Sequence, residues 1–546
     1  MAILITHGYL LTGTGSNLYV NNLVRELVRK GEDVILVCQD FDPKQIDFIN
    51  EVYEFDTTNT NYTLTNKKDT PFKGVCKCYK PNLNGFLPVY VYDHYQGFEV
   101  KEFTSCTTEE TMRYVDQNLN AMRCIVRDNK VEVINTNHMV MFPYIATQLK
   151  KEAKFKFVIT VHGSALNFTV KKDKRFEAYA IESLLAVDEI VVDSLHADEE
   201  LKEFLHDVKL ERLIEKIEII PAGVDVSSFG IASQKREELM SAFVQSIEAG
   251  AKESEGRTTE TTQKILNASV TEANVNSLVD EIRKAYDYRG IDKDAVSKVK
   301  AIDVNGNNVM FVGKYLWTKG IYLILLAIPK ILKEKPNTNF IIAGFGPFRE
   351  PAEIIVNCVA TGNIELLKKL VATNPLFHGD EGKHLPLIQD ILNKYGAEIA
   401  QDAKALNFDI RSRVTFTGIL NHKQLVNLLP AMDVLIAPSV FPEAFGMVAI
   451  EAASCGVYPV LTYQSAFREI GDQIRDLVDG RVKINNVDLN ENASANIAHN
   501  VIAYLQEKDK MSATQLSEFK DSLRKLVVDN YSWEGIAGKY LKTYLG

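Results

Sequence analysis

Short apolar runs alternate with helical patterns along most of the chain. In the first half, runs bounded by turn residues predict strands at Ile3–Thr6, Val34–Cys38, Val89–Tyr92, Val131–Asn135, Phe157–Val161, Glu189–Val192 and Ile217–Ile220. Between the first two, an apolar stripe predicts a helix that is capped by Ser16 or Asn17 and ends at Gly31. A strand, a glycine-rich loop, a helix and a second strand in this order predict a βαβ unit.

The same alternation begins again after residue 303. Apolar runs predict further strands at Val309–Val312, Phe340–Ala343, Val414–Thr417, Val434–Ala437, Pro459–Leu461 and Val482–Ile484. Alternating strands and helices are typical of a mostly parallel sheet covered by helices. We therefore expect an α/β fold with two Rossmann-like domains.

Length and polar segments set the expected domain boundaries. A single hydrophobic core stops growing at about 250–300 residues, and this chain has 546. We predict a first domain over 1–229, a helical insert or linker rich in Glu, Lys, Ser and Thr over 230–303, and a second domain over 304–515. A second polar insert, about 348–413, interrupts the second domain.

The final segment, 516–546, has the pattern of an amphipathic helix. It either closes the second core or crosses back to the first domain. Its expected apolar anchors are Trp533, Ile536, Tyr540, Leu541 and Tyr544.

Composition favours a small-molecule partner. The formal net charge of −10 argues against a general nucleic-acid surface. Seven cysteines do not form the dense, even framework of a small secreted domain. The start, MAILITHG, lacks the basic segment of a signal peptide, and no apolar run approaches the roughly 20 residues that span a bilayer. We expect a cytoplasmic protein, with peripheral membrane contact and oligomeric state left open.

Cys76 and Cys78 form a C-x-C pair. Such a pair supplies half of a metal site, but no second Cys or His pair at metal-ligand spacing accompanies it. We therefore expect no bound metal.

The loop after the first strand reads HGYLLTGTGSN. Gly13 and Gly15 allow the backbone to approach a ligand just before a helix N-terminus, where unpaired N–H groups favour phosphate. The loop is not a P-loop, and Leu18 stands where the dinucleotide fingerprint has its third glycine. A tight βα turn explains the glycines equally well.

The second half opens with FVGKYLWTKG. Lys314 and Lys319 flank a short loop that leaves a strand, so both ammonium groups are placed to reach one anion, such as a diphosphate. Two solvated surface lysines are the alternative.

The stretch DVLIAPSVFPEAFGMVAIEAASCG predicts a strand, a loop that contains Glu443, and a helix that contains Glu451. Glu451 lies in an apolar segment, where an unpaired carboxylate is costly, so it requires a fixed polar partner. Eight residues at helical rise separate the two carboxylates by up to about 12 Å, which suits opposite ends of one extended ligand. A nucleotide diphospho-sugar is such a ligand, and a buried structural salt bridge of Glu451 is the alternative.

The segment EAFGMVAIE, an E-x7-E motif, resembles the large retaining glycosyltransferase family 4, which has the GT-B fold. The resemblance extends to GTGSNLYVNNLVREL near the start, to THG at 160–163, to IIPAGVDVSSF at 219–229, and to VGKYLWTKG and IIAGFGP. It covers nearly the whole chain apart from the two inserts. It implies two Rossmann-like domains that face a central cleft.

The resemblance also implies roles for particular residues. Glu443 would bind hydroxyls of the donor sugar, and Glu451 the nucleotide ribose. Lys314 and Lys319 would bind the diphosphate, with Gly15 approaching the phosphate. His162 matches the family histidine beside the reacting centre, with a core histidine as the alternative. The other implied contacts toward the donor are the backbone amides of Ala444, Phe445, Gly446 and Met447. His7 and His138 also follow predicted strand ends at the same crevice, so they are candidate acceptor contacts, with a structural role as the alternative for each.

The chain departs from the family pattern at Lys314, where arginine is common in the family. Lysine keeps the charge but loses the bidentate fork. The expected activity is that of a retaining hexosyltransferase, which moves a sugar from a UDP-, GDP- or ADP-linked donor to a hydroxyl of a carbohydrate, lipid or small polar molecule. No cofactor or catalytic metal is implied. The alternatives are a catalytically silent nucleotide-sugar-binding protein and, with less support, an NAD-dependent oxidoreductase, whose glycine fingerprint is missing.

Overall fold

The chain divides into two compact units in the computed structural model, which describes residues 2–13, 15–91, 95–379, 385–478 and 480–546. Unit 1 comprises Met1–Gly223 and Tyr531–Gly546, and unit 2 comprises Val224–Asn530. The first break therefore follows Gly223 rather than residue 229. Of the final segment, only residues 531–546 group with unit 1.

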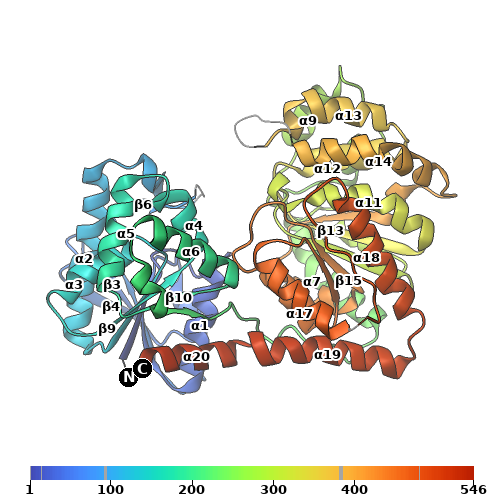
Figure 1. Cartoon of the computed structure of the whole chain (residues 1–546). Helices are drawn as coiled ribbons and strands as arrows, with labels where there is room; N and C mark the ends of the chain where they lie inside the picture. The colour runs from blue at the N-terminus through green and yellow to red at the C-terminus, as the bar shows by residue number, and fades with distance from the viewer. Residues whose placement is uncertain (1, 14, 92–94, 380–384, 479) are drawn as a thin grey trace. The chain divides into compact units, whose positions relative to one another are not determined.

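A nine-stranded sheet forms the centre of unit 1, in the order β11-β10-β9-β8-β1-β2-β5-β3-β4 (Figure 1). Only β4 runs antiparallel to its neighbour, β3. The central strands are apolar on both faces, as expected for a parallel sheet covered by helices. The strands are β1 (Ala2–Thr6), β2 (Asp33–Val37), β3 (Glu51–Phe55), β4 (Tyr62–Lys67), β5 (Cys76–Lys80), β8 (Val133–Asn137), β9 (Lys156–Val161), β10 (Glu189–Val192) and β11 (Ile217–Ile219), and a separate parallel pair is formed by β6 (Phe86–Val89) and β7 (Glu99–Glu102).

Helices connect the parallel strands of unit 1. The first predicted helix is confirmed as α1, and Gly31 ends it in the left-handed conformation that glycine tolerates. Its predicted cap is wrong, because Ser16 is the first helical residue and Gly15 takes the cap position without a side-chain hydrogen bond. The helices are α1 (Ser16–Lys30), α2 (Thr108–Asn129), α3 (Phe142–Lys150), α4 (Gly163–Ala165), α5 (Lys174–Ala186), α6 (Leu195–Asp207) and α20 (Trp533–Leu545).

Unit 2 is built on a five-stranded parallel sheet in the order β14-β13-β12-β15-β16. Its strands are β12 (Asn307–Val312), β13 (Thr338–Ala343), β14 (Val414–Gly418), β15 (Val434–Ala437) and β16 (Tyr458–Leu461). Its helices are α7 (Arg236–Glu253), α8 (Thr259–Leu266), α9 (Val275–Arg283), α10 (Ala295–Lys300), α11 (Ile321–Glu334), α12 (Arg349–Ala360), α13 (Ile364–Thr373), α14 (Pro386–Lys404), α15 (His422–Leu428), α16 (Met447–Ser454), α17 (Ser465–Val478), α18 (Ala493–Lys508) and α19 (Ala513–Tyr531). Both sheets confirm the expected α/β class.

The two polar segments are folded parts of unit 2. Residues 230–303 form α7 to α10, and α7 buries Leu239, Phe243 and Ile247 against α10 and α15. Within 348–413, α12 is almost wholly buried despite its charges, and Figure 1 shows α13 and α14 stacked beside it. The charged residues of α12 are buried because they pair with residues of the first segment, as the Glu350 and Arg257 side chains do at 2.8 Å.

Most predicted strands are confirmed within two residues of their bounds, and two are not. The run Val89–Tyr92 is wrong for its described part, because β6 ends at Val89 and Tyr92 lies outside the described residues. The run Val482–Ile484 is wrong because the chain there forms no ladder. The next residue, Asn485, instead exchanges backbone hydrogen bonds with the side chain of Asn500 at 2.8 and 2.9 Å.

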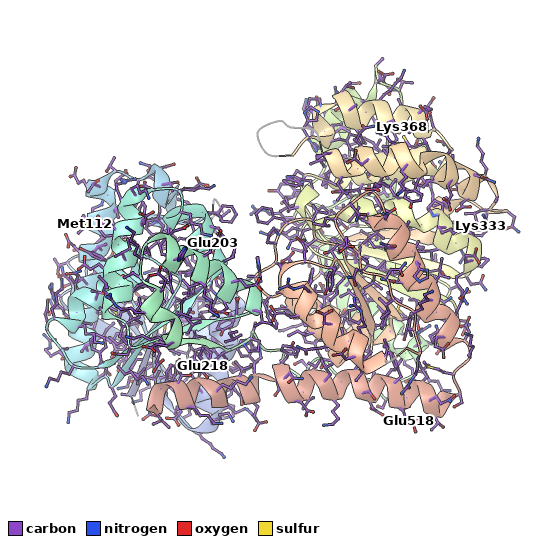
Figure 2. All side chains as sticks on the ribbon, in the orientation of Figure 1. Met112, Glu203, Glu218, Lys333, Lys368 and Glu518 are labelled. Atoms are coloured by element: carbon purple, nitrogen blue, oxygen red, sulfur yellow. The ribbon has the colours of Figure 1, made fainter. Side chains whose placement is uncertain are left out.

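The final helix α20 packs on unit 1 through most of the predicted anchors. Trp533, Ile536, Tyr540 and Tyr544 are buried, whereas Leu541 is half-buried. Polar contacts add to this packing, because Thr543 donates a hydrogen bond to Glu218, which Figure 2 labels beside the helix.

Candidate functional site

Polar side chains follow four neighbouring strands of unit 1. His7 follows β1, His138 follows β8, His162 follows β9 and Asp193 follows β10. Because the carboxyl ends of parallel strands meet at one edge of a sheet, these side chains are brought together. The His138 ring centroid lies 5.7 Å from that of His7 and 5.0 Å from that of His162. The structure thus joins the three histidines that the sequence singled out.

The His162 imidazole is held in one orientation. Its Nε2 lies 3.0 Å from Oδ1 of Asn137, whose amide nitrogen donates to the Thr6 carbonyl at 3.0 Å. The Asn137 oxygen therefore faces the ring, and His162 Nε2 donates the hydrogen bond. On the other side of the ring, Nδ1 lies 3.9 Å from Oδ2 of Asp193. His162 is buried as a core histidine would be, but its ring is fixed by the Asn137 hydrogen bond and has a carboxylate nearby, as a functional histidine has.

His7 and His138 are held neutral by burial. Burial lowers the pKa of His7 to about 4, against an opposing hydrogen bond to Asn17 at 2.8 Å. Burial also holds the pKa of His138 well below its usual range, and His162 and His7 lower it further. Neither ring nitrogen of His138 has a hydrogen-bond partner within the described part of the chain. His138 therefore has a donor and an acceptor available to a ligand or to water.

Gly15 leaves the N-terminus of α1 open. It has a positive φ of 61°, and a Cβ built there would meet no atom within 4 Å. The side chain of Asn17 does not cap the helix because it is bound to His7 and to the Thr12 carbonyl, the latter at 2.7 Å. The expected approach of Gly15 to a phosphate remains a prediction.

In unit 2, Lys319 forms an ion pair with Glu443. Lys319 ends a short 3-10 turn before α11, and its Nζ contacts Oε1 of Glu443 in the loop after β15. Ser439 donates to the same oxygen at 2.6 Å, and the Glu443 backbone N–H donates to Oγ of Ser465 at 2.9 Å. Oε2 of Glu443 has no partner among the described residues. The carboxylate is thus fixed through one oxygen and presents the other.

The two loops touch because the chain has glycine at position 320. Gly320 has a φ of +63°, and a Cβ there would lie 1.9 Å from the carbonyl oxygen of Pro438. The Val440 N–H donates to the Thr318 carbonyl at 2.8 Å, directly beside this contact. Any side chain at position 320 would push the Lys319 loop away from the Glu443 loop.

Glu451 lies on α16, and its polar partner is His422. Glu451 is 8% exposed, and its Oε1 lies 3.1 Å from Nε2 of His422. This hydrogen bond raises the pKa of His422 against the opposing effect of burial. Oε2 of Glu451 has no partner in the described ranges. Both carboxylates of the E-x7-E motif therefore keep one oxygen without a protein partner.

The start of α16 is formed by Gly446, whose φ of +85° suits glycine. A Cβ at this position would lie 2.2 Å from the ring of Phe467. Before it, Ala444 is exposed and Phe445 is buried, and Met447 is the half-buried first residue of the helix. The backbone N–H groups of this first turn have no acceptor inside the helix, as is usual at a helix N-terminus.

Lys314 differs from Lys319. It follows β12, is half-buried, and forms no ion pair with any described residue. The alternative of two solvated surface lysines is therefore wrong for Lys319, whose ammonium group is paired with Glu443. The ammonium group of Lys314 has no counter-ion among the described residues.

Several residues of these clusters were not predicted from the sequence. Asn137 and Asp193 lie at or just after strand ends, so the rule that selected the histidines would also have found them. Ser439 lies four positions before Glu443 in the same loop. No sequence pattern pointed to His422, because it reaches Glu451 from another helix.

The C-x-C pair and the helices bear on the expectations about metals and membranes. Cys76 and Cys78 lie on β5 as buried free thiols, and Cys78 Sγ lies 3.6 Å from Cys38 Sγ. The described residues contain no group of three or more His, Cys, Asp or Glu side chains placed to hold a metal ion. No helix in the described ranges is both long and apolar enough to cross a bilayer.

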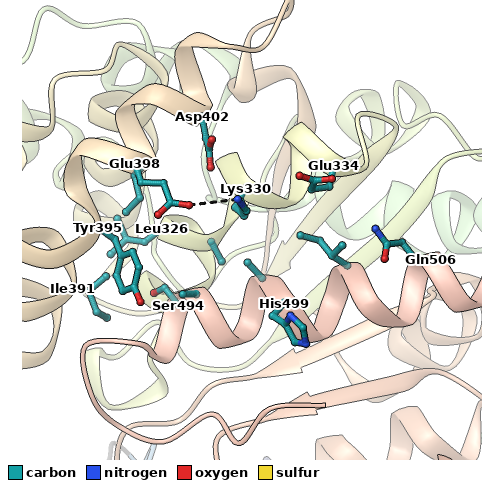
Figure 3. Close-up of a pocket in the computed structure, with 15 residues that line it drawn as sticks. Leu326, Lys330, Glu334, Ile391, Tyr395, Glu398, Asp402, Ser494, His499 and Gln506 are labelled. Atoms are coloured by element: carbon teal, nitrogen blue, oxygen red, sulfur yellow. Dashed lines mark hydrogen bonds and ion pairs between the residues drawn. The ribbon is translucent and has the colours of Figure 1, made fainter. Parts of the chain in front are cut away.

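An apolar cavity of about 260 Å³ lies apart from these residues, between α11, α14 and α18 (Figure 3). Its walls include Leu326 and Ile391, and the Lys330–Glu398 pair, 3.4 Å apart, borders it. The hydroxyl of Ser494 in its lining is buried without a hydrogen-bond partner among the described residues. None of the candidate site residues predicted from the sequence lines this cavity.

Comparison with curated proteins gives partial matches. Phosphatidyl-myo-inositol mannosyltransferase of Mycobacterium tuberculosis is 23% identical over 260 residues, which cover 47% of this chain and 52% of that protein. The phosphatidylinositol N-acetylglucosaminyltransferase gpi3 subunit of Schizosaccharomyces pombe is 26% identical over 162 residues, covering 30% of this chain and 25% of that protein. An uncharacterized glycosyltransferase of Methanocaldococcus jannaschii is 26% identical over 162 residues, covering 30% and 28%. The chain thus spans about half or less of the length of the curated relatives it matches.

Solved structures match over the whole chain at low identity. Anabaena HepE in complex with UDP has a TM-score of 0.50 and 12% identity, with 100% of this chain and 99% of that chain covered. An Escherichia coli structure described as trehalose-6-phosphate bound with UDP-2-fluoro glucose has a TM-score of 0.51 and 10% identity, with coverage of 100% and 99%. These likenesses concern the fold alone, and the fold is GT-B.

A family model described as glycosyl transferases group 1 matches residues 400–510, which include β14 to α18 and both motif carboxylates. Residues 400–510 thus form a glycosyltransferase group 1 domain, and the curated relatives of the chain are named as glycosyltransferases.

Proposed function

We propose that the protein is a retaining glycosyltransferase of family 4, which transfers a hexose from a nucleotide diphospho-sugar to an acceptor hydroxyl. One observation carries the proposal. Lys319, Glu443 and the N-terminus of α16 meet at the carboxyl ends of β12 and β15, with Oε2 of Glu443 left without a protein partner among the described residues. Cations and a helix N-terminus suit a diphosphate, and a carboxylate oxygen suits sugar hydroxyls.

Each group in unit 2 has a role in this proposal. Oε2 of Glu443 accepts hydrogen bonds from the donor sugar, and Glu451 accepts them from the ribose. Lys314, which has no counter-ion in the described chain, binds the diphosphate, and Lys319 is shared between Glu443 and the leaving phosphate. The amides of residues 444–447 complete the donor contacts. Charge on the departing diphosphate is then countered by lysines and helix amides, so no metal is needed.

Unit 1 contributes the substrate contacts of the proposal through its histidines. His162 is the proposed reaction-side histidine, with its ring oriented by Asn137 and with the Asp193 carboxylate 3.9 Å from Nδ1. His7 and His138 are the proposed acceptor contacts. Because burial keeps both rings neutral, His138 offers one donor and one acceptor nitrogen, which suits hydroxyl groups. In His7 the Nε2 atom is bound to Asn17, so only Nδ1 is left for a substrate. Gly15, at the open start of α1, is the proposed phosphate contact of this unit.

The chemistry proceeds with retention at the anomeric carbon. The bond from that carbon to the diphosphate oxygen breaks, a bond to the acceptor oxygen forms on the same face, and the departing phosphate takes the acceptor proton. The names of the relatives suggest a polyol on a lipid as one acceptor to test, beside free sugars. UDP is the first nucleotide to test, because UDP or a UDP-sugar is named in both of the solved structures of like fold described above.

The test has two stages. Thermal-shift binding against UDP, GDP, ADP and their glucose, mannose and N-acetylglucosamine conjugates identifies the donor, because selective binding raises apparent stability. Release of the free nucleotide diphosphate with a hydroxyl acceptor then measures turnover, and NMR of the product's anomeric configuration tests retention. Binding without turnover over a wide acceptor panel favours the silent nucleotide-sugar-binding protein. Absence of any shift contradicts the donor assignment.

A further inference from the structure

A second cavity in unit 2 lies beside the Lys314–Lys319 loop. Its volume is about 520 Å³, within the range of about 300–1,000 Å³ that is usual for small-molecule sites. Three parts of the chain form it: the loop after β12, helix α9 of the first polar segment, and residues 347–378 at the start of and within the second polar segment. Its lining includes Asn276, Asp280, Arg283, Trp317, Phe348 and His378.

One wall is polar and comes from a single face of α9. Asn276, Asp280 and Arg283 are spaced by four and three positions, so they project from the same side of the helix. Asp280 is exposed and forms no ion pair within the described chain. Arg283 donates through Nε to Glu350 at 2.9 Å and through Nη2 to the Pro347 carbonyl at 2.8 Å, which leaves Nη1 for a ligand.

The rest of the lining is mainly aromatic and apolar. The Trp317 indole is half-buried and packs against Gly379, where a Cβ would lie 3.1 Å from the ring. Phe348 is 5% exposed and also lines the cavity. The Nε2 atom of His378 is buried without a hydrogen-bond partner among the described residues. The cavity therefore combines a flat aromatic surface with an amide, a carboxylate, a guanidinium and an imidazole.

The charges of the cavity restrict its ligand. The guanidinium of Arg283 is paired with Glu350, whereas the Asp280 carboxylate has no paired cation among the described residues, so the cavity does not favour an anion such as a phosphate. A purely apolar ligand would leave the polar side chains without partners. A neutral ring that has one apolar face and many hydroxyls satisfies both walls, because its face packs on the indole and its hydroxyls meet the α9 side chains.

We propose that this cavity is an accessory carbohydrate site that binds a neutral pyranose residue between Trp317 and the Asn276–Asp280–Arg283 face. It is separate from the proposed donor groups, since none of Lys314, Lys319, Glu443 or Glu451 lines it. Trp317 nevertheless lies between Lys314 and Lys319 in sequence. A bound sugar residue therefore contacts the same loop that holds the proposed diphosphate ligands. The two polar segments supply side chains such as Asp280 and His378, so the cavity is more than the turn between a strand and a helix.

Tryptophan fluorescence reports on this cavity directly, because the chain has only two tryptophans, Trp317 and Trp533. In Trp533→Phe, emission comes from Trp317 alone. We would titrate this variant with maltotriose, cellotriose, chitotriose and mannotriose, each with and without saturating UDP. A saturable emission change with at least one sugar, retained in the presence of UDP, is the expected result. The same titration of Trp317→Phe should give no change.

Variants of α9 locate the ligand. Asp280→Ala in the Trp533→Phe background should raise the Kd of the bound sugar about tenfold, as expected for loss of a charged hydrogen bond. Ser277→Ala is the matched control, because Ser277 is exposed on the same helix and does not line the cavity. It should leave the Kd unchanged.

Three results would overturn the inference. They are no saturable change with any of the four sugars, a change that Asp280→Ala and Ser277→Ala affect alike, and a change that UDP abolishes. The last result would place the sugar at the donor groups and leave the proposed function intact. Sugar binding without any nucleotide binding would instead contradict the proposed function and support the accessory site.

Discussion

His422 Nε2 lies 3.1 Å from Glu451 Oε1, which binds the first residue of α15 to the second carboxylate of the E-x7-E motif. The pKa of His422 is raised, first by this hydrogen bond and in part by the charge of Glu451. An imidazolium at this position fixes the carboxylate and leaves its other oxygen for a ligand. The pair gives Glu451 the polar partner that its buried position requires.

The His422–Glu451 pair should make stability depend on pH. Because the folded pKa of His422 is raised, the contribution of the pair is fully present below the unfolded pKa of about 6.5 and is lost as pH rises through the folded value. The difference in Tm between wild type and His422→Ala should therefore be largest below pH 6.5 and shrink at higher pH. His499→Ala is the control, since its ring bonds to the Lys483 carbonyl. An equal pH dependence for both variants would contradict the assignment.

Substitution of Lys319 should weaken UDP binding, whereas substitution of Glu443 should mainly reduce turnover. Lys319→Met removes a cation from the proposed diphosphate, and the loss of a charged hydrogen bond of about 1.5–3 kcal/mol should weaken UDP binding ten- to hundredfold. Glu443→Gln should keep UDP binding within a fewfold and remove most turnover, because the sugar contact is the one altered. Calorimetric Kd values and nucleotide release measure the two effects. Lys330→Met, which alters the exposed Lys330–Glu398 pair, should change neither.

The sequence predicted the central strands of both units better than the edges. Runs such as Phe340–Ala343 are buried on both faces, so their composition alone identifies β13. The unit 1 strands β3, β4, β5 and β7 were missed because polar or charged residues interrupt their apolar pattern. The Val131–Asn135 run was placed two residues early, and the observed β8 ends at Asn137, directly before His138.

The candidate site was predictable where one local segment carries it. Glu443 and Glu451 belong to one short loop and helix, and their positions follow from the chain between them. The partners of these residues were not predictable, because Lys319 and His422 reach them from other elements through tertiary packing. The burial of the charged residues of α12 was not predicted, for the same reason. A run rich in Arg and Glu is normally solvated, and only its pairing with 254–300 makes burial favourable.

The buried histidines of unit 1 should make the protein sensitive to mild acid. The pKa of His7 falls to about 4, so between about pH 6.5 and 4 the unfolded chain binds a proton that the folded chain does not. Stability should therefore decrease as pH falls through this window, by up to about 3 kcal/mol for His7 alone. His7→Gln should flatten this part of the pH profile in urea unfolding. His206→Gln, an exposed histidine on α6, is the control. An unchanged slope in His7→Gln would mean that the ring is charged in the folded state.

Two buried serines of unit 2, Ser494 and Ser454, should respond in opposite ways to alanine substitution. Ser494 Oγ has no partner in the described chain, so Ser494→Ala should raise the free energy of unfolding by about 1 kcal/mol. Ser454 donates a hydrogen bond to the Phe229 carbonyl, so Ser454→Ala should lower it by a similar amount. Urea unfolding of both variants compares them directly. Destabilisation of both would mean that Ser494 has a partner in solution, such as a bound water.

The buried charge network around α12 should contribute much of the stability of the packing between the two polar segments. Arg257 is fully buried and lies 2.8 Å from Glu350 and 3.0 Å from Glu353, two carboxylates that are themselves buried. Arg257→Met would leave them without one of their cations and should cost about 3–5 kcal/mol, because an uncompensated buried charge is expensive. Lys369→Met breaks an exposed pair with Glu272 at 3.2 Å and should cost less than about 1 kcal/mol. If both variants unfold at the same urea concentration, Glu350 and Glu353 are either protonated or hydrated in the folded protein, and the network does not join the segments.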